Sequence, residues 1–147
     1  MIPCTPGRRL IGASALSIAT LLSFDMPARA ATGCPAGTFT GFLQAFAADM
    51  AVQRAHTRIP LIDETVDPNA EPEPRTVRRM LDAAHIRFPL LPSPAEQRRK
   101  HMTMHSRAVP AGMETTLRTG ETDDQIRLLF RREKGCWTLI RRSDDSL

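Results

Sequence analysis

The first thirty residues constrain this chain most, because they carry the pattern of a cleavable export signal and leave only the remainder to form a fold. Arg8 and Arg9 precede an apolar run from Leu10 to Phe24, and Ala28-Arg29-Ala30 matches the small-residue pattern that signal peptidase recognises. We expect residues 1–30 to be removed as a signal peptide, so that the mature chain is periplasmic or secreted. The apolar run is shorter than the roughly 20 residues that span a bilayer, so we expect no membrane span.

Two alternatives to this interpretation stay open. Residues 31–34, Ala-Thr-Gly-Cys, resemble a lipoprotein processing site at which Cys34 would receive a lipid anchor, but Asp25, Pro27 and Arg29 separate this cysteine from the apolar run. The pair Arg8-Arg9 resembles a twin-arginine signal, but the neighbouring glycines depart from that pattern. We therefore expect the general secretory route and release in soluble form.

The mature chain has the size of one domain and carries little net charge. The formal net charge of the whole chain is +4, and the predicted signal peptide holds three arginines and one aspartate, which leaves +2. We expect residues 31–147 to form a single α+β domain. The nearly neutral balance and the expected location argue against a nucleic-acid partner.

The cysteines predict one cross-link. Cys4 leaves with the signal peptide, and Cys34 and Cys136 remain as a pair in a compartment that oxidises thiols. A disulfide between them would join the two ends of the domain. Two buried free thiols are an alternative, and a redox site is another, although the pair lacks the close Cys-x-x-Cys spacing that tunes thiol reactivity.

A long N-terminal helix is predicted directly after the first of these cysteines. Apolar residues recur at steps of three and four from Thr38 to about Arg54, which gives the helix one face for a core. That face comprises Phe39, Phe42, Leu43, Phe46, Met50 and Gln53. Such a face needs a broad apolar partner, and a sheet provides one.

The middle of the chain predicts an edge strand, a loop and two helices. Ile59-Pro60-Leu61-Ile62 is a short apolar run with a proline, which is typical of an edge strand. Residues 63–74 contain five acids, three prolines and no base, which predicts a solvated acidic, Pro-rich loop. Helical spacing predicts a helix from Arg75 to Phe88. The start Ser93-Pro94-Ala95-Glu96 predicts a short helix toward His101.

The end of the chain predicts paired strands. Apolar and basic residues alternate from Gln125 to Arg132, a tight turn follows, and Cys136 to Arg141 alternates again. These patterns predict an antiparallel meander. The expected fold class is α+β, with the long N-terminal helix packed on a curved antiparallel sheet.

Short motifs at both ends of the mature chain resemble a known group of proteins. They are Phe42-x-x-x-Phe46-x-x-Asp49-x-x-x-Gln53, then Pro60-Leu61, then Phe130 with Gly135-Cys136-Trp137-x-Leu139, and the closing Asp144-Asp145-Ser146-Leu147. They resemble small exported bacterial proteins of unknown function with a nuclear transport factor two-like, or cystatin-like, α+β roll. The resemblance implies a cone-shaped domain with a pocket between helix and sheet, but no catalytic residue, since this fold serves many functions.

One group of candidate site residues lies at the end of the predicted first helix. Asp49, Gln53, His56 and Arg58 would sit where such a pocket opens, and an aspartate near a histidine suits acid or base chemistry. The plainer interpretation is structural. Asp49 and Gln53 would satisfy backbone groups at the sheet edge, and Arg58 would pair with an acid of the loop.

Two further patterns are candidates for binding. Arg127 and Arg131 share one face of the predicted last strands, within a basic cluster that suits an anionic polymer or an acidic protein, although a solvated sheet face is also typical of such charge. The run His101-Met102-Thr103-Met104-His105 holds soft ligand types that suit copper. No further ligand completes that site, and the run also fits a short strand, so we assign no metal.

These patterns favour an exported, non-catalytic domain that binds a small ligand or a protein of the cell envelope. Binding would use either the helix-sheet pocket or the arginine-rich face. An enzyme acting on a small molecule, with Asp49 or His56 as acid or base, is one alternative. An inhibitor or immunity protein against an envelope toxin is another. We assign no catalytic residue and no cofactor.

Overall fold

The structure is a computed structural model that describes Met1, residues 33–120, Thr122 and residues 124–146. The predicted signal peptide and its cleavage site fall outside the described residues, apart from Met1. Within the described part, no helix is both long and apolar enough to cross a membrane.

Two short helices, α1 (Phe39–Ala48) and α2 (Met50–Ala55), replace the predicted long N-terminal helix. The break falls at Asp49, whose backbone is extended and whose side chain accepts a hydrogen bond from the Ala51 amide at 2.7 Å. An aspartate favours such a cap over a helix interior because its carboxylate competes for backbone amides. The prediction of one continuous helix is therefore wrong.

The apolar face before this break forms as predicted. Phe42 and Phe46 are fully buried, whereas Met50, just beyond Asp49, is 51% exposed because the break turns it away from the core. The ring of Phe130 on the sheet lies within 5.8 Å of the rings of both buried phenylalanines. Each such burial contributes about 2–3 kcal/mol, so these contacts hold α1 on the sheet.

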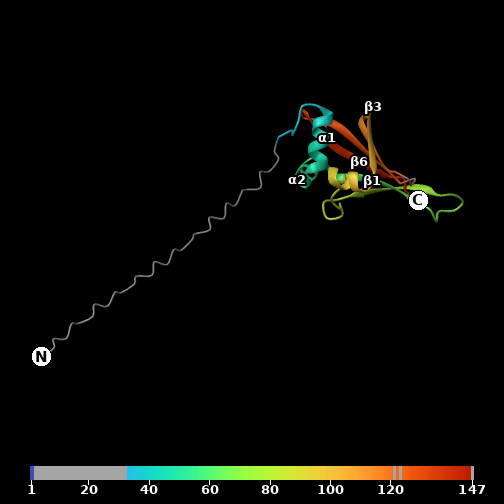
Figure 1. The fold of residues 1–147 in the computed structure, drawn as a ribbon. Helices are drawn as coiled ribbons and strands as arrows, with labels where there is room; N and C mark the ends of the chain where they lie inside the picture. The colour runs from blue at the N-terminus through green and yellow to red at the C-terminus, as the bar shows by residue number, and fades with distance from the viewer. Residues whose placement is uncertain (2–32, 121, 123, 147) are drawn as a thin grey trace.

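Six strands form one curved sheet in the order β2-β1-β6-β5-β4-β3 (Figure 1). They are β1 (Thr57–Asp67), β2 (Arg75–Leu81), β3 (Met102–Val109), β4 (Gly112–Thr119), β5 (Gln125–Glu133) and β6 (Cys136–Asp144). Neighbouring strands are antiparallel except β1 and β6, which run parallel. The sheet is therefore mixed, and the prediction of a wholly antiparallel sheet is wrong for the pair β1 and β6.

The loop predicted at residues 63–74 is shorter in the structure. Residues 63–67 continue β1, and only residues 68–74 connect it to β2. The acids of β1 are accommodated because bases far away in sequence face them. Asp63 accepts a hydrogen bond from Arg142 at 2.9 Å, and Glu64 accepts one from Arg78 at 2.8 Å. Composition alone did not reveal these partners.

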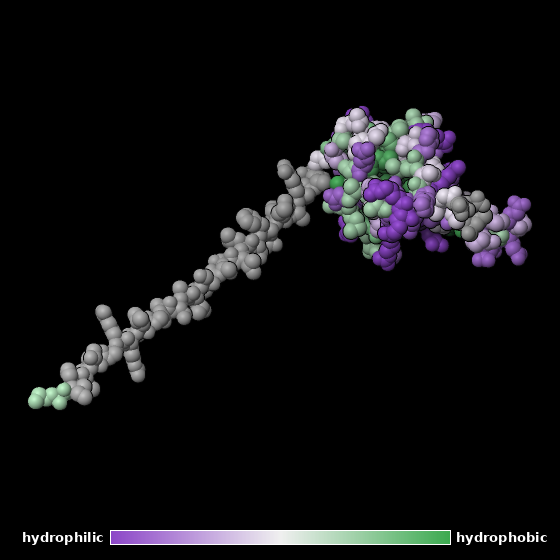
Figure 2. All heavy atoms as spheres, viewed as in Figure 1, coloured by the Kyte–Doolittle hydropathy of each residue, from purple (hydrophilic) through white to green (hydrophobic). Residues whose placement is uncertain are grey.

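The β1–β2 hairpin projects from the rest of the molecule (Figure 1). Its projecting end is hydrophilic (Figure 2). The predicted edge strand Ile59–Ile62 belongs to β1, which has β6 on one side and β2 on the other, so the edge assignment is wrong. The predicted helix from Arg75 to Phe88 is also wrong, because residues 75–81 pair with β1 as β2.

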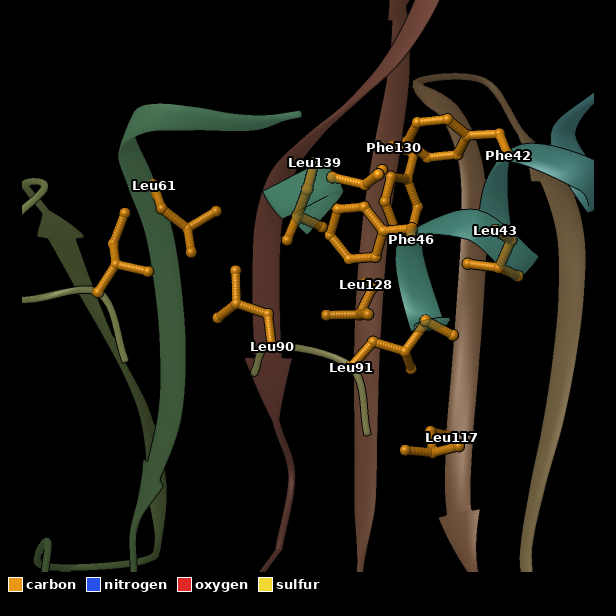
Figure 3. Close-up of a cluster of buried hydrophobic side chains, with 13 residues drawn as sticks. Phe42, Leu43, Phe46, Leu61, Leu90, Leu91, Leu117, Leu128, Phe130 and Leu139 are labelled. Carbon is orange, nitrogen blue, oxygen red and sulfur yellow. The ribbon is translucent and has the colours of Figure 1, made fainter. Parts of the chain in front are cut away.

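The segment between β2 and α3 (Pro94–Arg99) fills the inner side of the sheet. Leu90 and Leu91, 6% and 0% exposed, lie beside Leu128 and Phe46 in the core (Figure 3). The predicted start of the third helix is confirmed, since the Ser93 hydroxyl accepts a hydrogen bond from the Glu96 amide.

The predictions for the end of the chain are also confirmed. β5 and β6 pair in antiparallel fashion through the predicted turn. Cys34 and Cys136 form a disulfide that spans 102 residues of sequence and ties the segment before α1 to the start of β6.

Candidate functional site

A hollow of about 530 Å³ lies on the side of β3, β4 and β5 that faces away from the helices. Side chains alternate between the two faces of a strand, so residues two apart line the same face. We call this feature the outer hollow. Its lining residues are Thr103, His105, Arg107, Glu114, Thr116, Arg118, Gln125 and Arg127.

Strand register brings these residues together. Arg118 lies opposite Thr103 on β3 and opposite Gln125 on β5. Thr116 in the same way lies between His105 and Arg127. Residues opposite each other on paired strands lie about 5 Å apart, so a side chain from each of the three strands borders the same small area.

Two of the three arginines in the outer hollow already bind carboxylates. Arg107 donates through Nε and Nη2 to Glu114, at 3.0 and 2.7 Å. Arg127 donates through Nε and Nη2 to Asp145, at 2.7 and 3.1 Å. The hydrogen bond to Asp145 raises the pKa of Arg127 above its ordinary value, so this guanidinium stays charged. These two pairs fix the orientation of the side chains that they join.

Arg118 is held differently. Its Nε donates to the amide oxygen of Gln125 at 2.9 Å, and the amide nitrogen of Gln125 donates to Asp145 at 3.1 Å. Among the described residues, no carboxylate forms an ion pair with Arg118, and its terminal nitrogens have no hydrogen-bond acceptor. The outer hollow is therefore lined by one guanidinium that Gln125 holds through its Nε and whose terminal nitrogens bond no described residue.

Burial and hydrogen bonding shift the pKa of Asp145 in opposite directions. Partial burial raises the pKa of this carboxyl, but hydrogen bonds from Arg127 and Gln125 lower it by more, so the net pKa is below the ordinary value. Asp145 is therefore ionised near neutral pH. The network from Arg118 through Gln125 and Asp145 to Arg127 stays charged under those conditions.

The inner side of the sheet is mostly filled. Phe42, Phe46, Leu90 and Leu91 occupy the space where the resemblance implied a pocket between helix and sheet (Figure 3). A cleft of about 410 Å³ remains toward the hairpin. Its Arg142 already donates to both Asp63 and Asp144, at 2.9 and 2.6 Å, so its charge is neutralised.

The predicted acid-base group does not form a common site. Asp49 is the N-cap of α2 and His56 its C-cap, so the six residues of the helix lie between them and separate them by about 10 Å. Asp49 is exposed and caps α2. The His56 ring packs against Phe42 with ring centroids 5.4 Å apart. This geometry does not support the enzyme hypothesis, in which either residue would face a substrate pocket.

The other predicted site residues have structural contacts. Gln53 is 1% exposed and bonds the backbone of Leu90 and Leu91, not the sheet edge. Arg58 pairs with Glu133 of β5, not with an acid of the loop. Arg131 is exposed on the same side of β5 as Arg127 but lies outside the outer hollow, about 13 Å along the strand.

Sequence reasoning missed most of the outer hollow. Arg107, Glu114, Thr116 and Arg118 belong to strands that were not predicted; Arg127 was named as a binding candidate, and Thr103 and His105 only as part of the run considered for metal. Alternation of polar residues in Glu114-Thr-Thr-Leu-Arg118 was a usable signal, because Leu117 between them is buried. The run His101–His105 is divided between a turn and β3. Within the described residues, no group of three or more histidines, cysteines, aspartates or glutamates lies close enough together to hold a metal ion.

The fold and the hollow define a small α+β domain with a polar outer sheet face. No model of a protein family matches the chain, and no curated protein matches it. Among solved structures, the chain is similar to an NTF2-like protein from Bacteroides fragilis, with a TM-score of 0.53 and 22% sequence identity. The match covers 74% of this chain but 47% of that protein, so the chain corresponds to about half of its length. The likeness shows an NTF2-like fold.

Proposed function

We propose that this chain is an exported, disulfide-linked binding domain that holds an acidic ligand in the outer hollow. The observation that carries the proposal is the orientation of Arg118. Its Nε donates to Gln125, its terminal nitrogens bond no described residue, and its side chain lines a hollow of about 530 Å³. A carboxylate accepts two parallel hydrogen bonds from such a guanidinium. The volume is within the usual range for small-ligand sites.

The chemistry of the lining favours a polar ligand over a protein partner. Threonine hydroxyls, an imidazole, an amide and the Glu114 carboxylate that Arg107 binds accompany the three arginines, and no aromatic or large apolar side chain lines the outer hollow. Protein interfaces depend on buried aromatic anchors, which this face lacks. A carboxylate-bearing sugar segment, with one acid group and several hydroxyls, matches the lining best.

The proposal predicts charge-dependent binding of a uronic-acid oligosaccharide. Trigalacturonate is the probe, and its fully methyl-esterified form is the neutral control. We expect the Arg118→Gln protein to bind trigalacturonate at least about tenfold more weakly than the unaltered protein, because a hydrogen bond to a charged group contributes about 1.5–3 kcal/mol. Isothermal titration calorimetry at low salt measures both affinities.

The control variant is Arg99→Gln, which removes the same charge from an exposed residue of α3. It should bind trigalacturonate as the unaltered protein does. Equal binding of the esterified probe, or equal affinity of the Arg118→Gln and Arg99→Gln proteins, contradicts the proposal.

Export is the second part of the proposal, and the sequence of residues 1–30 supports it. The intact mass of the protein purified from its native host tests this part. We expect the mass of residues 31–147 less two hydrogens for the disulfide. A mass that includes Met1, or one increased by acyl chains on Cys34, contradicts cleavage after Ala30 and release in soluble form.

A further inference from the structure

His56 contacts the disulfide. Its Nδ1 lies 3.7 Å from the Cys136 Sγ, and its Nε2 is buried with no hydrogen-bond partner among the residues that the structure describes. The Leu139 amide donates to the His56 backbone carbonyl at 2.8 Å, which ties the end of α2 to β6 close to Cys136. The imidazole is therefore held beside one sulfur of the bridge.

The closed bridge offers the His56 Nδ1 only a weak partner, because a disulfide sulfur is a weak hydrogen-bond acceptor. A thiolate is a much stronger partner for an imidazole, because the protonated ring and the sulfur anion then form an ion pair. The Nδ1 that faces the Cys136 Sγ would therefore gain a charged partner when the bridge opens.

The two sulfurs of the bridge differ in access. Cys34 is exposed in the segment before α1, whereas Cys136 is half-buried beside Trp137 at the start of β6. An external thiolate reaches Cys34 more easily. Attack at Cys34 makes Cys136 the leaving group, and a leaving thiol of lower pKa departs faster.

We propose that Cys34–Cys136 is an exchangeable disulfide, in which Cys34 forms a mixed disulfide with a small thiol and His56 stabilises the released Cys136 thiolate. The incoming sulfur bonds to the Cys34 Sγ, and the bond between Cys34 and Cys136 breaks with its electron pair on Cys136. The proton of the incoming thiol ends on His56. The co-reactant is a monothiol of the glutathione class.

The charged residues around His56 do not compete with the pairing of its ring with a Cys136 thiolate. α1 contains no ionisable side chain, and Arg58, two residues after His56, pairs with Glu133, which lies opposite Cys136. These two charges neutralise each other. Arg132 lies over the Trp137 ring, 5.9 Å from its centroid. No carboxylate among the described residues contacts His56.

The Cys34→Ser protein tests the role of His56 directly, because Cys136 is then its one thiol in the mature chain. Thiolate absorbance at 240 nm against pH gives the Cys136 pKa. We expect a value below about 7.5, as for thiols beside a protonated histidine. In the Cys34→Ser/His56→Phe protein we expect about 8.5 or higher. His85→Phe, in place of His56→Phe, alters an exposed histidine and should leave the Cys136 pKa unchanged.

Exchange of the unaltered protein with glutathione should be about tenfold faster than that of the His56→Phe protein. The factor of ten corresponds to a Cys136 pKa about 2 units lower with His56 than without it, because rates of thiol exchange change by roughly half a log unit per pKa unit; the 1-unit minimum expected above gives about threefold. Equal rates, or a Cys136 pKa near 8.5 with His56 present, overturn the proposal.

A measurement without substitutions covers the case in which His56→Phe does not fold. Nuclear magnetic resonance titration of the His56 ring is compared between the oxidised protein and the protein reduced by dithiothreitol. We expect the His56 pKa to rise on reduction, since a neighbouring thiolate favours the protonated ring. An unchanged His56 pKa overturns the proposal.

Discussion

Gln53 illustrates how a residue that appears suited to a site serves the fold instead. Its amide nitrogen donates to the Leu91 carbonyl at 2.8 Å, and its amide oxygen accepts from the Leu90 amide at 2.7 Å. The segment after β2 has no regular structure at these residues, so its backbone needs such partners. One buried side chain thereby fixes the leucines that fill the inner side of the sheet.

Replacing Gln53 by leucine should lower the free energy of unfolding by about 2–4 kcal/mol. The substitution keeps the volume but leaves backbone groups of Leu90 and Leu91 buried without partners, at about 1–3 kcal/mol for each group. Urea denaturation followed by Trp137 fluorescence measures the change. Gln44→Leu, at an exposed position of α1, is the matched control and should stay within about 0.5 kcal/mol. A similar loss in both variants argues against this role of Gln53.

At the scale of elements, β1 shows why local composition failed to predict a strand at residues 63–67. Its acids predicted a loop because no base is near them in sequence, yet strand pairing brings Arg78 from β2 and Ser143 from β6 to Glu64. Burial alone raises the pKa of Glu64. The hydrogen bonds from Ser143 and Arg78 and the charge of Arg141 outweigh burial, so the net pKa is lowered. The carboxylate therefore joins three adjacent strands.

The lowered pKa of Glu64 predicts a pH dependence. A carboxyl whose pKa is lower when folded stabilises the fold above its unfolded pKa, about 4.3, and loses this effect as pH falls through the folded value. We expect Glu64→Gln to cost about 1–2 kcal/mol at pH 6, and the difference from the unaltered protein to shrink toward pH 3. Urea unfolding at pH 6, 4 and 3 measures it. Glu71→Gln, on the exposed hairpin end, should show no such trend, and a constant difference for Glu64→Gln rules out this contribution.

At the scale of the whole molecule, the disulfide joins segments that lie 102 residues apart in sequence. Residues 33–38, the described segment directly before α1, form no strand or helix. Its attachment to the start of β6 keeps Phe39 against Trp137, with ring centroids 5.0 Å apart. The bridge also restricts the unfolded chain, which is the larger effect in the chain-entropy account.

Removal of the bridge in a Cys34→Ser/Cys136→Ser protein should lower the free energy of unfolding by about 4 kcal/mol. Urea denaturation of the oxidised unaltered protein and of the variant provides the comparison. A reducing agent should destabilise the unaltered protein and leave the variant unchanged. A loss below about 1 kcal/mol would mean that the bridge does not constrain the unfolded chain as this account requires.

The sequence by itself determined the features that depend on neighbouring residues and on the number of cysteines. The Ser93 cap of α3, the β5–β6 hairpin, the apolar face of α1 and the pairing of Cys34 with Cys136 were all predicted from spacing, turn chemistry or number. The NTF2-like fold was expected from a resemblance.

Only the tertiary structure decided the length of β1, the identity of β2 and the contents of the outer hollow. Glu64 and Asp63 of β1 have partners that lie 14 and 79 residues away in the sequence, on β2 and β6. No local pattern encodes these partners. The outer hollow depends on the register of three strands, which sets Arg118 beside Gln125 and Thr103. Register is fixed by the shared core beneath the sheet, so it cannot be read from any one strand.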